Sequence, residues 1–349
     1  MPSPAPARPP ESTHLFREAA EAAAVVESQL RLNAGDMDRL VRDLKSRPRT
    51  IIVTLARGSS DHAATYARYL IETRLGILTA SAAPSVSSLY ESRLDLRDAI
   101  VLAISQSGES PDLIASVESA RRSGACVIAL VNAENSPLAQ SANFTLPLRA
   151  GKESSVAATK SFIASLAAIA QLVAAWCGDR NLCAALELLP AQLRDAWRLD
   201  WTEALPRLRN AQSLYVLGRG PGLGIAGEAA LKLKETCGIH AEAFSTAELQ
   251  HGPLAIVGSG FPVLVFAQND ASHSGIVELV RELDALRAHV LTVGVRGSDG
   301  TRLPVIHADP AVAPLLQILS FYRMVNALAV ARGYDPDRPR HLSKITETT

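Results

Sequence analysis

An internal repeat constrains the fold of this chain more than any other feature of the sequence. Residues 51–59 (IIVTLARGS) and 214–221 (LYVLGRGP) are both short apolar stretches that run into Arg-Gly. Gly58 and Gly220 are 162 residues apart, and so are Gln106 and Gln268, each of which follows another apolar stretch. A constant spacing over two pairs of positions indicates duplication of one folding unit.

Within each copy, short apolar stretches alternate with helical patterns, which predicts an α/β fold. We expect two tandem units, each a doubly wound, flavodoxin-like parallel sheet flanked by helices on both faces. Ligands of such sheets bind at the carboxyl ends of the strands. The expected strands are 51–56, 99–104, 126–131, 214–218, 262–267 and 289–295, and the expected helices are 61–75, 111–123, 224–237 and 274–287.

Charge and cysteine content limit the partners. The 35 basic and 35 acidic side chains cancel, so nothing favours a nucleic acid or an anionic membrane.

The apolar run 161–177 is too short and too rich in Ser, Ala and Gln for a membrane span, and predicts a buried helix. The N-terminus has no signal-peptide pattern, and no cysteine spacing fits a metal site or disulfide framework. We expect reduced structural thiols in a cytoplasmic protein, at Cys126, Cys177, Cys183 and Cys237.

Hydroxyl groups follow two of the expected strands. Residues 105–112 read SQSGESPD, and Pro111 suits the first turn of a helix. A helix N-terminus with free amide groups and hydroxyls is suited to bind phosphate. A Ser-rich helix cap is the alternative for this loop taken alone. Ser59 and Ser60 follow the strand expected at 51–56, so hydroxyl groups from two strand ends would meet. We therefore favour a phosphate cradle.

Ionisable residues concentrate between positions 228 and 251. Glu228, Lys232 and Glu235 have the i, i+4, i+7 spacing of one helix face, which predicts either a surface ladder of ion pairs or the lining of a cleft. A carboxylate beside a lysine there suits a general base. His251 precedes Gly-Pro in a turn and suits proton transfer near neutral pH. His240 and Glu242 fit core hydrogen bonding or support of the site equally.

Five motifs together resemble the sugar isomerase (SIS) family, and more narrowly the isomerase half of the glutamine–fructose-6-phosphate amidotransferases. They are SQSGES (105–110), SSVAATKSF (154–162), EAALKLKE (228–235), HAEAFSTAELQHGPLA (240–255) and HLSKITET (341–348). The resemblance implies an enzyme that acts on an amino-sugar phosphate. The implied reaction requires no metal or organic cofactor. The Gly218–Gly224 run resembles a dinucleotide-binding fingerprint only loosely.

The resemblance also implies roles for matching residues. Glu235 would move a proton between sugar carbons, and His251 would open the ring from the neighbouring subunit of a homodimer. Lys344 would be catalytic too, although Ser343 replaces the alanine usual before it, and Arg57 replaces a small residue beside the first turn. The implied substrate-binding residues are Ser60, Ser105, Gln106, Ser107, Ser110, Val156, Glu228 and Lys232.

The N-terminal glutaminase domain of the amidotransferases has no counterpart in this sequence, so we expect the opposite direction of reaction. This is deamination of glucosamine 6-phosphate to fructose 6-phosphate and ammonia. Alternatives are a fructosamine 6-phosphate deglycase, a galactosamine 6-phosphate deaminase, a ketose–aldose isomerase, or a sugar-phosphate sensor without catalysis. The expected divisions are a disordered tail (1–14), two domains (15–195 and 196–333) and an active-site tail (334–349).

Overall fold

The computed structural model describes residues 8–47, 49–295 and 300–344, and it contains two five-stranded sheets in which every pair of neighbouring strands is parallel. The first sheet has the order β2-β1-β3-β4-β5. Its strands are β1 (Ile51–Leu55), β2 (Leu78–Ser81), β3 (Ala99–Ser105), β4 (Cys126–Val131) and β5 (Phe144–Pro147). Strands β3 and β4 are buried along their whole length, as the continuous apolar runs of a parallel sheet require.

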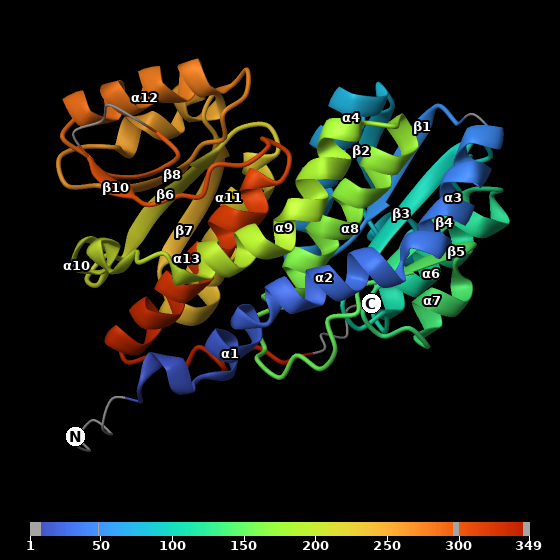
Figure 1. Cartoon of the computed structure of the whole chain (residues 1–349), viewed down its shortest axis with the longest axis horizontal. Helices are drawn as coiled ribbons and strands as arrows, with labels where there is room; N and C mark the ends of the chain where they lie inside the picture. Colours follow the sequence, from blue (N-terminus) through green and yellow to red (C-terminus); the bar gives the residue numbers. More distant parts are fainter. Residues whose placement is uncertain (1–7, 48, 296–299, 345–349) are drawn as a thin grey trace. The chain divides into compact units, whose positions relative to one another are not determined.

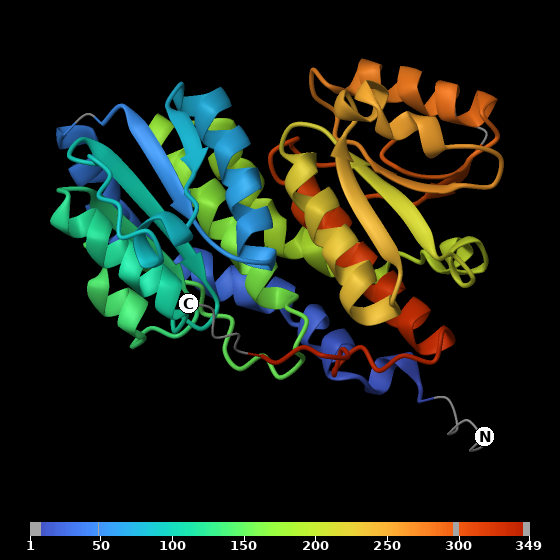
Figure 2. The ribbon, with the colours of Figure 1, turned by 180° about the vertical axis from the view of Figure 1, so that it is seen from behind.

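Helices from several parts of the chain accompany the first sheet (Figures 1 and 2). The two that follow its central strands are α4 (Ser59–Leu75) and α6 (Pro111–Arg122). The others are α2 (Ala22–Leu32), α3 (Ala34–Ser46), α5 (Ser85–Ser88), α7 (Pro137–Ser141), α8 (Lys160–Cys177) and α9 (Arg180–Arg198).

The second sheet has the order β10-β9-β8-β6-β7. Helix α12 covers one of its faces, and α11 and α13 cover the other (Figure 1). Its strands are β6 (Ser213–Gly218), β7 (His240–Ser245), β8 (Pro262–Phe266), β9 (His289–Val293) and β10 (Thr301–Leu303). The helices are α10 (Leu205–Leu208), α11 (Gly222–Cys237), α12 (His273–Ala285) and α13 (Ala313–Ala331), with 3₁₀ turns at Thr202–Ala204, Glu248–His251 and Pro253–Ile256.

The two sheets confirm the duplication that the sequence predicts. Read from β2 and from β7, their strand orders are the same. The 162-residue offset carries the start of β1 onto the start of β6, and the start of α6 onto the start of α12. It also holds to within one residue for the starts of β3 and β8 and of β4 and β9. Equivalent strand ends in the two copies can therefore be compared residue by residue.

The chain divides into two compact units that do not follow the sequence strictly. One contains the second sheet and takes in residues 1–23, 153–159 and 191–342; the other contains the first sheet with residues 24–152, 160–190 and 343–349. The predicted boundaries at 195 and 333 stay predictions.

The predicted disorder of residues 1–14 is wrong for the part that the structure describes. Pro10–Ser12 form a 3₁₀ turn, α1 (His14–Ala20) follows, and Thr13 is fully buried. The Thr13 hydroxyl donates to Pro10 O and lies 2.7 Å from Asn326 Oδ1, while Asp337 accepts hydrogen bonds from the amides of His14 and Leu15. These bonds order the segment despite its prolines. Residues 1–7 and 345–349 lie outside the described residues.

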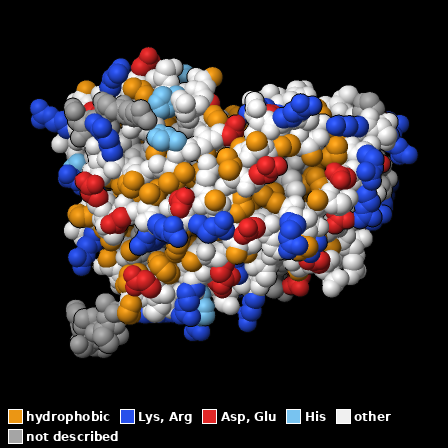
Figure 3. Space-filling view, in the orientation of Figure 1, with side chains coloured by type: hydrophobic (Ala, Val, Ile, Leu, Met, Phe, Trp, Pro, Cys, Tyr) orange, Lys and Arg blue, Asp and Glu red, His pale blue; other side chains and the backbone are white. Residues whose placement is uncertain are grey.

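Two helices, α8 and α13, are long and apolar enough to cross a membrane, and most of each is buried inside the protein. They behave as core helices, which confirms the prediction of a buried helix at 161–177. Acidic and basic side chains are interspersed on the face seen in Figure 3. Cys126 and Cys237 are buried, but Cys177 and Cys183 are exposed, so the prediction of structural thiols holds for only two of the four.

Candidate functional site

The loop after β3 forms a compact turn built around Gly108. The Gly108 amide donates to Ser105 Oγ at 3.0 Å, and the Glu109 amide donates to Ser107 Oγ at 3.3 Å. Gly108 has a φ of +67°, and a Cβ at this position would lie 2.1 Å from Ser136 Oγ. Only glycine therefore fits, since a side chain would meet both backbone strain and a clash. Gln106 O accepts from the Ala133 amide, which ties the turn to the loop after β4.

The N-terminus of α6 faces this turn without a side-chain cap. Ser110 is the N-cap residue, yet its hydroxyl makes no capping hydrogen bond, and Pro111 occupies the first turn. The alternative of a Ser-rich helix cap is therefore not what forms. The Ser110 hydroxyl remains available for an anion, as a phosphate cradle requires, whereas the Leu113 amide of the first turn already donates to Asp112 Oδ1 at 2.8 Å.

Arg57 and Asp112 join the ends of β1 and β3 beside the cradle. Arg57 Nε and Nη2 donate to Asp112 Oδ2 at 3.0 and 2.7 Å. Asp112 is 2% exposed, whereas the Arg57 side chain is 52% exposed. Ser60, in the first turn of α4, is half-buried and follows Gly58, whose φ is +54°. The Arg57 guanidinium therefore neutralises the Asp112 carboxylate. This carboxylate lies in the first turn of α6, where the phosphate would bind.

The charged stripe of α11 is a buried network. Lys232 Nζ lies 2.6 Å from Glu235 Oε2 and 3.3 Å from Glu228 Oε1. Glu228 and Lys232 are fully buried, while 18% of the Glu235 side chain is exposed. The structure therefore excludes the surface ion-pair ladder. Neither Glu228 nor Lys232 offers surface to a ligand, so their geometry suits holding Glu235 rather than the predicted substrate contact.

A tyrosine completes the network from α13. Tyr322 Oη donates to Glu228 Oε1 at 2.9 Å. Burial raises the pKa of Tyr322 well above its usual value, and nearby Glu228 adds to the effect, so the phenol stays a donor. Burial alone would lower the pKa of Lys232, but the carboxylates of Glu228 and Glu235 outweigh it and raise this pKa. Lys232 is therefore a permanent cation that steadies a partly exposed carboxylate.

The other predicted residues are found on turns and termini. His251 ends the 3₁₀ turn Glu248–His251; its imidazole is exposed, and Gly252 follows with a φ of +137°. Val156 is half-buried, and its amide donates to Asp337 O at 3.2 Å. Lys344, the last described residue, is half-buried.

The predicted residues fall into both compact units. Ser60, the cradle and Lys344 belong to the unit of the first sheet, and Val156, the α11 network and His251 belong to the other. His240 and Glu242 are exposed on β7, so neither is a core hydrogen-bonding residue. The exposure of both residues follows from the position of β7 at the edge of its sheet, where it has a neighbouring strand on one side only.

Sequence reasoning missed Tyr322 and Asp112. Tyr322 is the only tyrosine in the apolar segment 313–331, and a buried phenol needs a partner. Asp112 was visible in the SQSGESPD motif, but its partner Arg57 lies 55 residues away. Only the pairing of β1 with β3 brings these two residues together.

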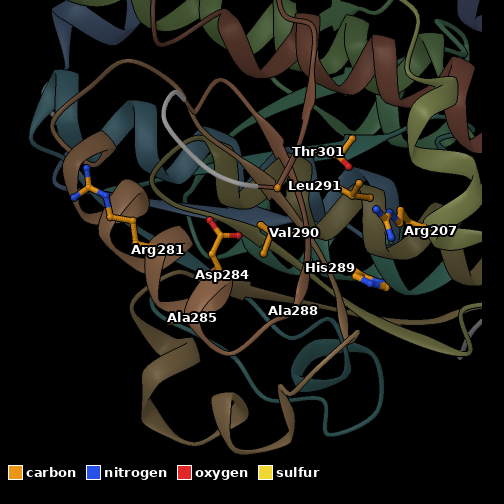
Figure 4. A pocket seen from close by; sticks show the side chains of 10 residues that line it. Arg207, Arg281, Asp284, Ala285, Ala288, His289, Val290, Leu291 and Thr301 are labelled. Carbon is orange, nitrogen blue, oxygen red and sulfur yellow. The ribbon is translucent and has the colours of Figure 1, made fainter.

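A pocket of about 480 Å³ lies elsewhere and holds none of the predicted site residues (Figure 4). Its walls include Arg207, Arg281, His289 and Thr301. His289 and Thr301 begin β9 and β10, so this pocket is at the amino end of the second sheet. Ligands of parallel sheets bind at the opposite end.

Comparison with known proteins gives the family. The SIS domain model matches residues 46–175 and 207–304. The chain belongs to the SIS domain family. Each of the two matched ranges covers one copy of the duplicated fold. The match confirms two tandem SIS domains and the family resemblance of the motifs.

The individual relatives have names that refer to sugar phosphates. A glutamine–fructose-6-phosphate aminotransferase of Sulfurisphaera tokodaii is 32% identical over 95% of this chain, which spans 56% of that protein. A crystal structure from Silicibacter pomeroyi DSS-3, named provisionally as a phosphosugar isomerase, is 44% identical with a TM-score of 0.89, over 93% of this SIS chain and all of the other. The glucosamine-6-phosphate deaminase of Thermotoga maritima shares the fold, with a TM-score of 0.76 and 23% identity over 96% of this chain and all of the other.

Proposed function

We propose that this SIS protein is an enzyme that converts glucosamine 6-phosphate and water to fructose 6-phosphate and ammonia. The observation that carries the proposal is the Glu235 carboxylate, partly exposed and held by a buried lysine that is itself fixed by Glu228. Such a carboxylate suits repeated proton transfer at carbon. The uncapped hydroxyl turn at Ser105–Ser110 supports a phosphorylated substrate.

Each step of the proposed reaction uses a residue of suitable chemistry. The phosphate binds the cradle, and His251 transfers a proton to the ring oxygen as the ring opens. Glu235 removes the proton from C2 of the open amino aldose and returns it at C1, while one proton of the amine passes to O1, so that an alcohol at C1 and an imine at C2 are formed. Water adds to this imine and ammonia departs, so fructose 6-phosphate is formed. Lys344 is kept as a third catalytic group, and borohydride trapping tests whether its amine forms a Schiff base.

The proposal includes a homodimer in the cytoplasm. The exposed imidazole of His251, at the end of a 3₁₀ turn, supports a role for this residue in the site of a neighbouring subunit. In a two-fold dimer each copy would donate one histidine and receive one. No nucleic acid, membrane, metal or organic cofactor takes part in the proposed reaction.

An ammonia assay tests the proposal directly. The enzyme is offered glucosamine 6-phosphate, galactosamine 6-phosphate and a fructosamine 6-phosphate, and released ammonia is measured with and without glutamine. We expect ammonia from glucosamine 6-phosphate and no glutamine-dependent synthesis from fructose 6-phosphate. Synthesis with glutamine as donor would contradict the proposed direction.

A deglycase of amino-acid-derived fructosamine 6-phosphates is the second candidate. It is favoured by Arg57, whose guanidinium is half exposed beside the cradle and could bind the carboxylate of the attached amino acid. The same panel separates the two candidates, because a deglycase would release an amino acid from the fructosamine substrate and little ammonia from glucosamine 6-phosphate.

A further inference from the structure

Three consecutive backbone amides anchor the loop that carries Val156. The Ser154 amide donates to Glu18 Oε1, and the Ser155 amide donates to Glu18 Oε2 at 3.1 Å. The Val156 amide donates to Asp337 O at 3.2 Å. All of these residues belong to one compact unit. The three amides therefore hold the loop against α1 and against the segment around Asp337, and they are not free for a ligand.

The same loop, residues 153–159, is also closed on itself. Glu153 Oε1 accepts a hydrogen bond from the Thr159 amide at 2.9 Å, and both residues are buried. This bond joins the two ends of the loop. The loop therefore keeps its own shape, and the bonds from outside decide where it lies.

Glu18 is an ionisable residue on the buried face of α1. It is 6% exposed, and its neighbours on this face, Leu15 and Ala19, are fully buried. A buried carboxylate destabilises a fold unless it is paired or hydrogen-bonded. Among the described residues no Lys or Arg pairs with Glu18, and its donors are the two loop amides. Hydrogen bonds to a charged acceptor are stronger than neutral ones, so Glu18 is suited to hold the loop in one position.

The loop neighbours the network that holds Glu235. Burial is the main cause of the raised pKa of Tyr322, and the carboxylate of Glu228 is the next cause. Glu153, the first residue of the loop, adds to the same effect, ahead of Glu235. Glu153 therefore lies within electrostatic range of the Tyr322 phenol. The position of the loop thus affects the space beside the proposed base.

We propose that Glu18 is a positioning residue for the substrate. By holding the amides of Ser154 and Ser155, its carboxylate keeps Val156 in place as a wall of the sugar-phosphate site beside Glu235. Glu18 acts through the loop and is not itself a catalytic residue. The inference rests on the proposed function, because it takes the surroundings of Glu235 as the place where the sugar binds.

Steady-state kinetics and calorimetric titration of fructose 6-phosphate, both on the full chain, test the proposal. Glu18→Gln keeps the shape of the side chain, but its nitrogen is a donor and would face one of the two donating amides. Thr13→Ala is the matched control. It removes the oxygen that accepts from the Phe16 amide at the start of α1, and it leaves Glu18 unchanged. Thermal unfolding checks that each variant is folded at the assay temperature.

We expect Glu18→Gln to raise KM for glucosamine 6-phosphate and Kd for fructose 6-phosphate roughly tenfold, with kcat nearly unchanged. Thr13→Ala should keep the wild-type KM and Kd, because partial unfolding lowers only the fraction of active enzyme and hence kcat. If Glu18→Gln does not fold, Glu18→Asp, whose side chain is one methylene shorter, decides by the same comparison.

Three results would overturn the inference. They are a wild type that does not bind fructose 6-phosphate, a folded Glu18 variant with the wild-type Kd, and an equal rise of Kd in Thr13→Ala. A wild type that binds fructose 6-phosphate but releases no ammonia refutes the deaminase proposal alone, and the titration then still decides on the role of Glu18.

Discussion

At the scale of single residues, charge neutralisation explains the arrangement around the cradle. Asp112 is a buried carboxylate in the first turn of α6, where a phosphate would also bind. Arg57 supplies the compensating charge through two hydrogen bonds. An unpaired carboxylate here would repel the phosphate and so weaken substrate binding.

Arg57→Gln should therefore raise KM for the sugar phosphate roughly tenfold and change kcat little. Adding Asp112→Asn should restore most of the affinity, because the repelling charge is gone. Steady-state kinetics of the two single variants and the double variant measure this. A double variant no better than Arg57→Gln would refute the neutralising role.

Cys237 gives a second residue-scale prediction, in alkaline stability. Burial raises the pKa of this thiol from 9.0 to about 12, so the unfolded chain loses its proton at lower pH than the folded protein does. Stability is therefore fully present below pH 9 and declines as the pH rises toward 12. At pH 10 the loss from Cys237 is about 1.4 kcal/mol.

Chemical denaturation at pH 8 and pH 10 checks this, with Cys237→Ala as the comparison. The wild-type protein should lose about 1.4 kcal/mol more between the two pH values than the variant. Tyr322, whose pKa is also raised, contributes the same sign to both proteins and cancels. Equal losses would mean that the thiol does not titrate as its burial requires.

At the scale of structural elements, the proposed phosphate site depends on the turn that follows β3. The turn after β3 depends on glycine, because residue 108 has a positive φ and lies against Ser136. Gly108→Ala should cost about 1–3 kcal/mol of stability and abolish most binding of fructose 6-phosphate. Denaturation and calorimetric titration measure the two effects.

Gly35→Ala is the matched control for this substitution. Gly35 lies in α3, and an added Cβ would meet nothing within 4 Å. This variant should gain about 0.5–1 kcal/mol from helix propensity and bind the sugar phosphate normally. Normal phosphate binding by Gly108→Ala would show that the turn is not the cradle.

At the scale of the whole molecule, the proposed dimer makes each active site depend on two chains. His251→Ala and Glu235→Gln should each be inactive alone, because both residues take part in the proposed reaction. After exchange, one site of a mixed dimer carries both lesions and the other carries neither. Equal mixing makes half of the dimers mixed, so about a quarter of the wild-type activity should return. No recovery after proven exchange would place the whole site within one chain.

Much of this architecture could be predicted from the sequence, because it rests on local patterns. The central strands and the helices after them follow apolar runs and turn residues, and the repeat fixes their shared topology. The edge strands β2, β5, β7 and β10 were missed, since all four are partly exposed and all except β7 have only three or four residues. The pairs Tyr322–Glu228 and Arg57–Asp112 join residues 94 and 55 positions apart, so only tertiary packing reveals them.

The central claim is that Glu235 acts as the base in the deamination of an amino-sugar phosphate. One measurement tests it most directly, which is the simultaneous release of ammonia and fructose 6-phosphate from glucosamine 6-phosphate by the wild type and by Glu235→Gln. We predict equal amounts of both products from the wild type, and a kcat roughly 10²–10⁴-fold lower in a variant that remains folded, because Glu228 still pairs with Lys232. Near-wild-type turnover by a folded Glu235→Gln, or no ammonia from the wild type, would contradict the account.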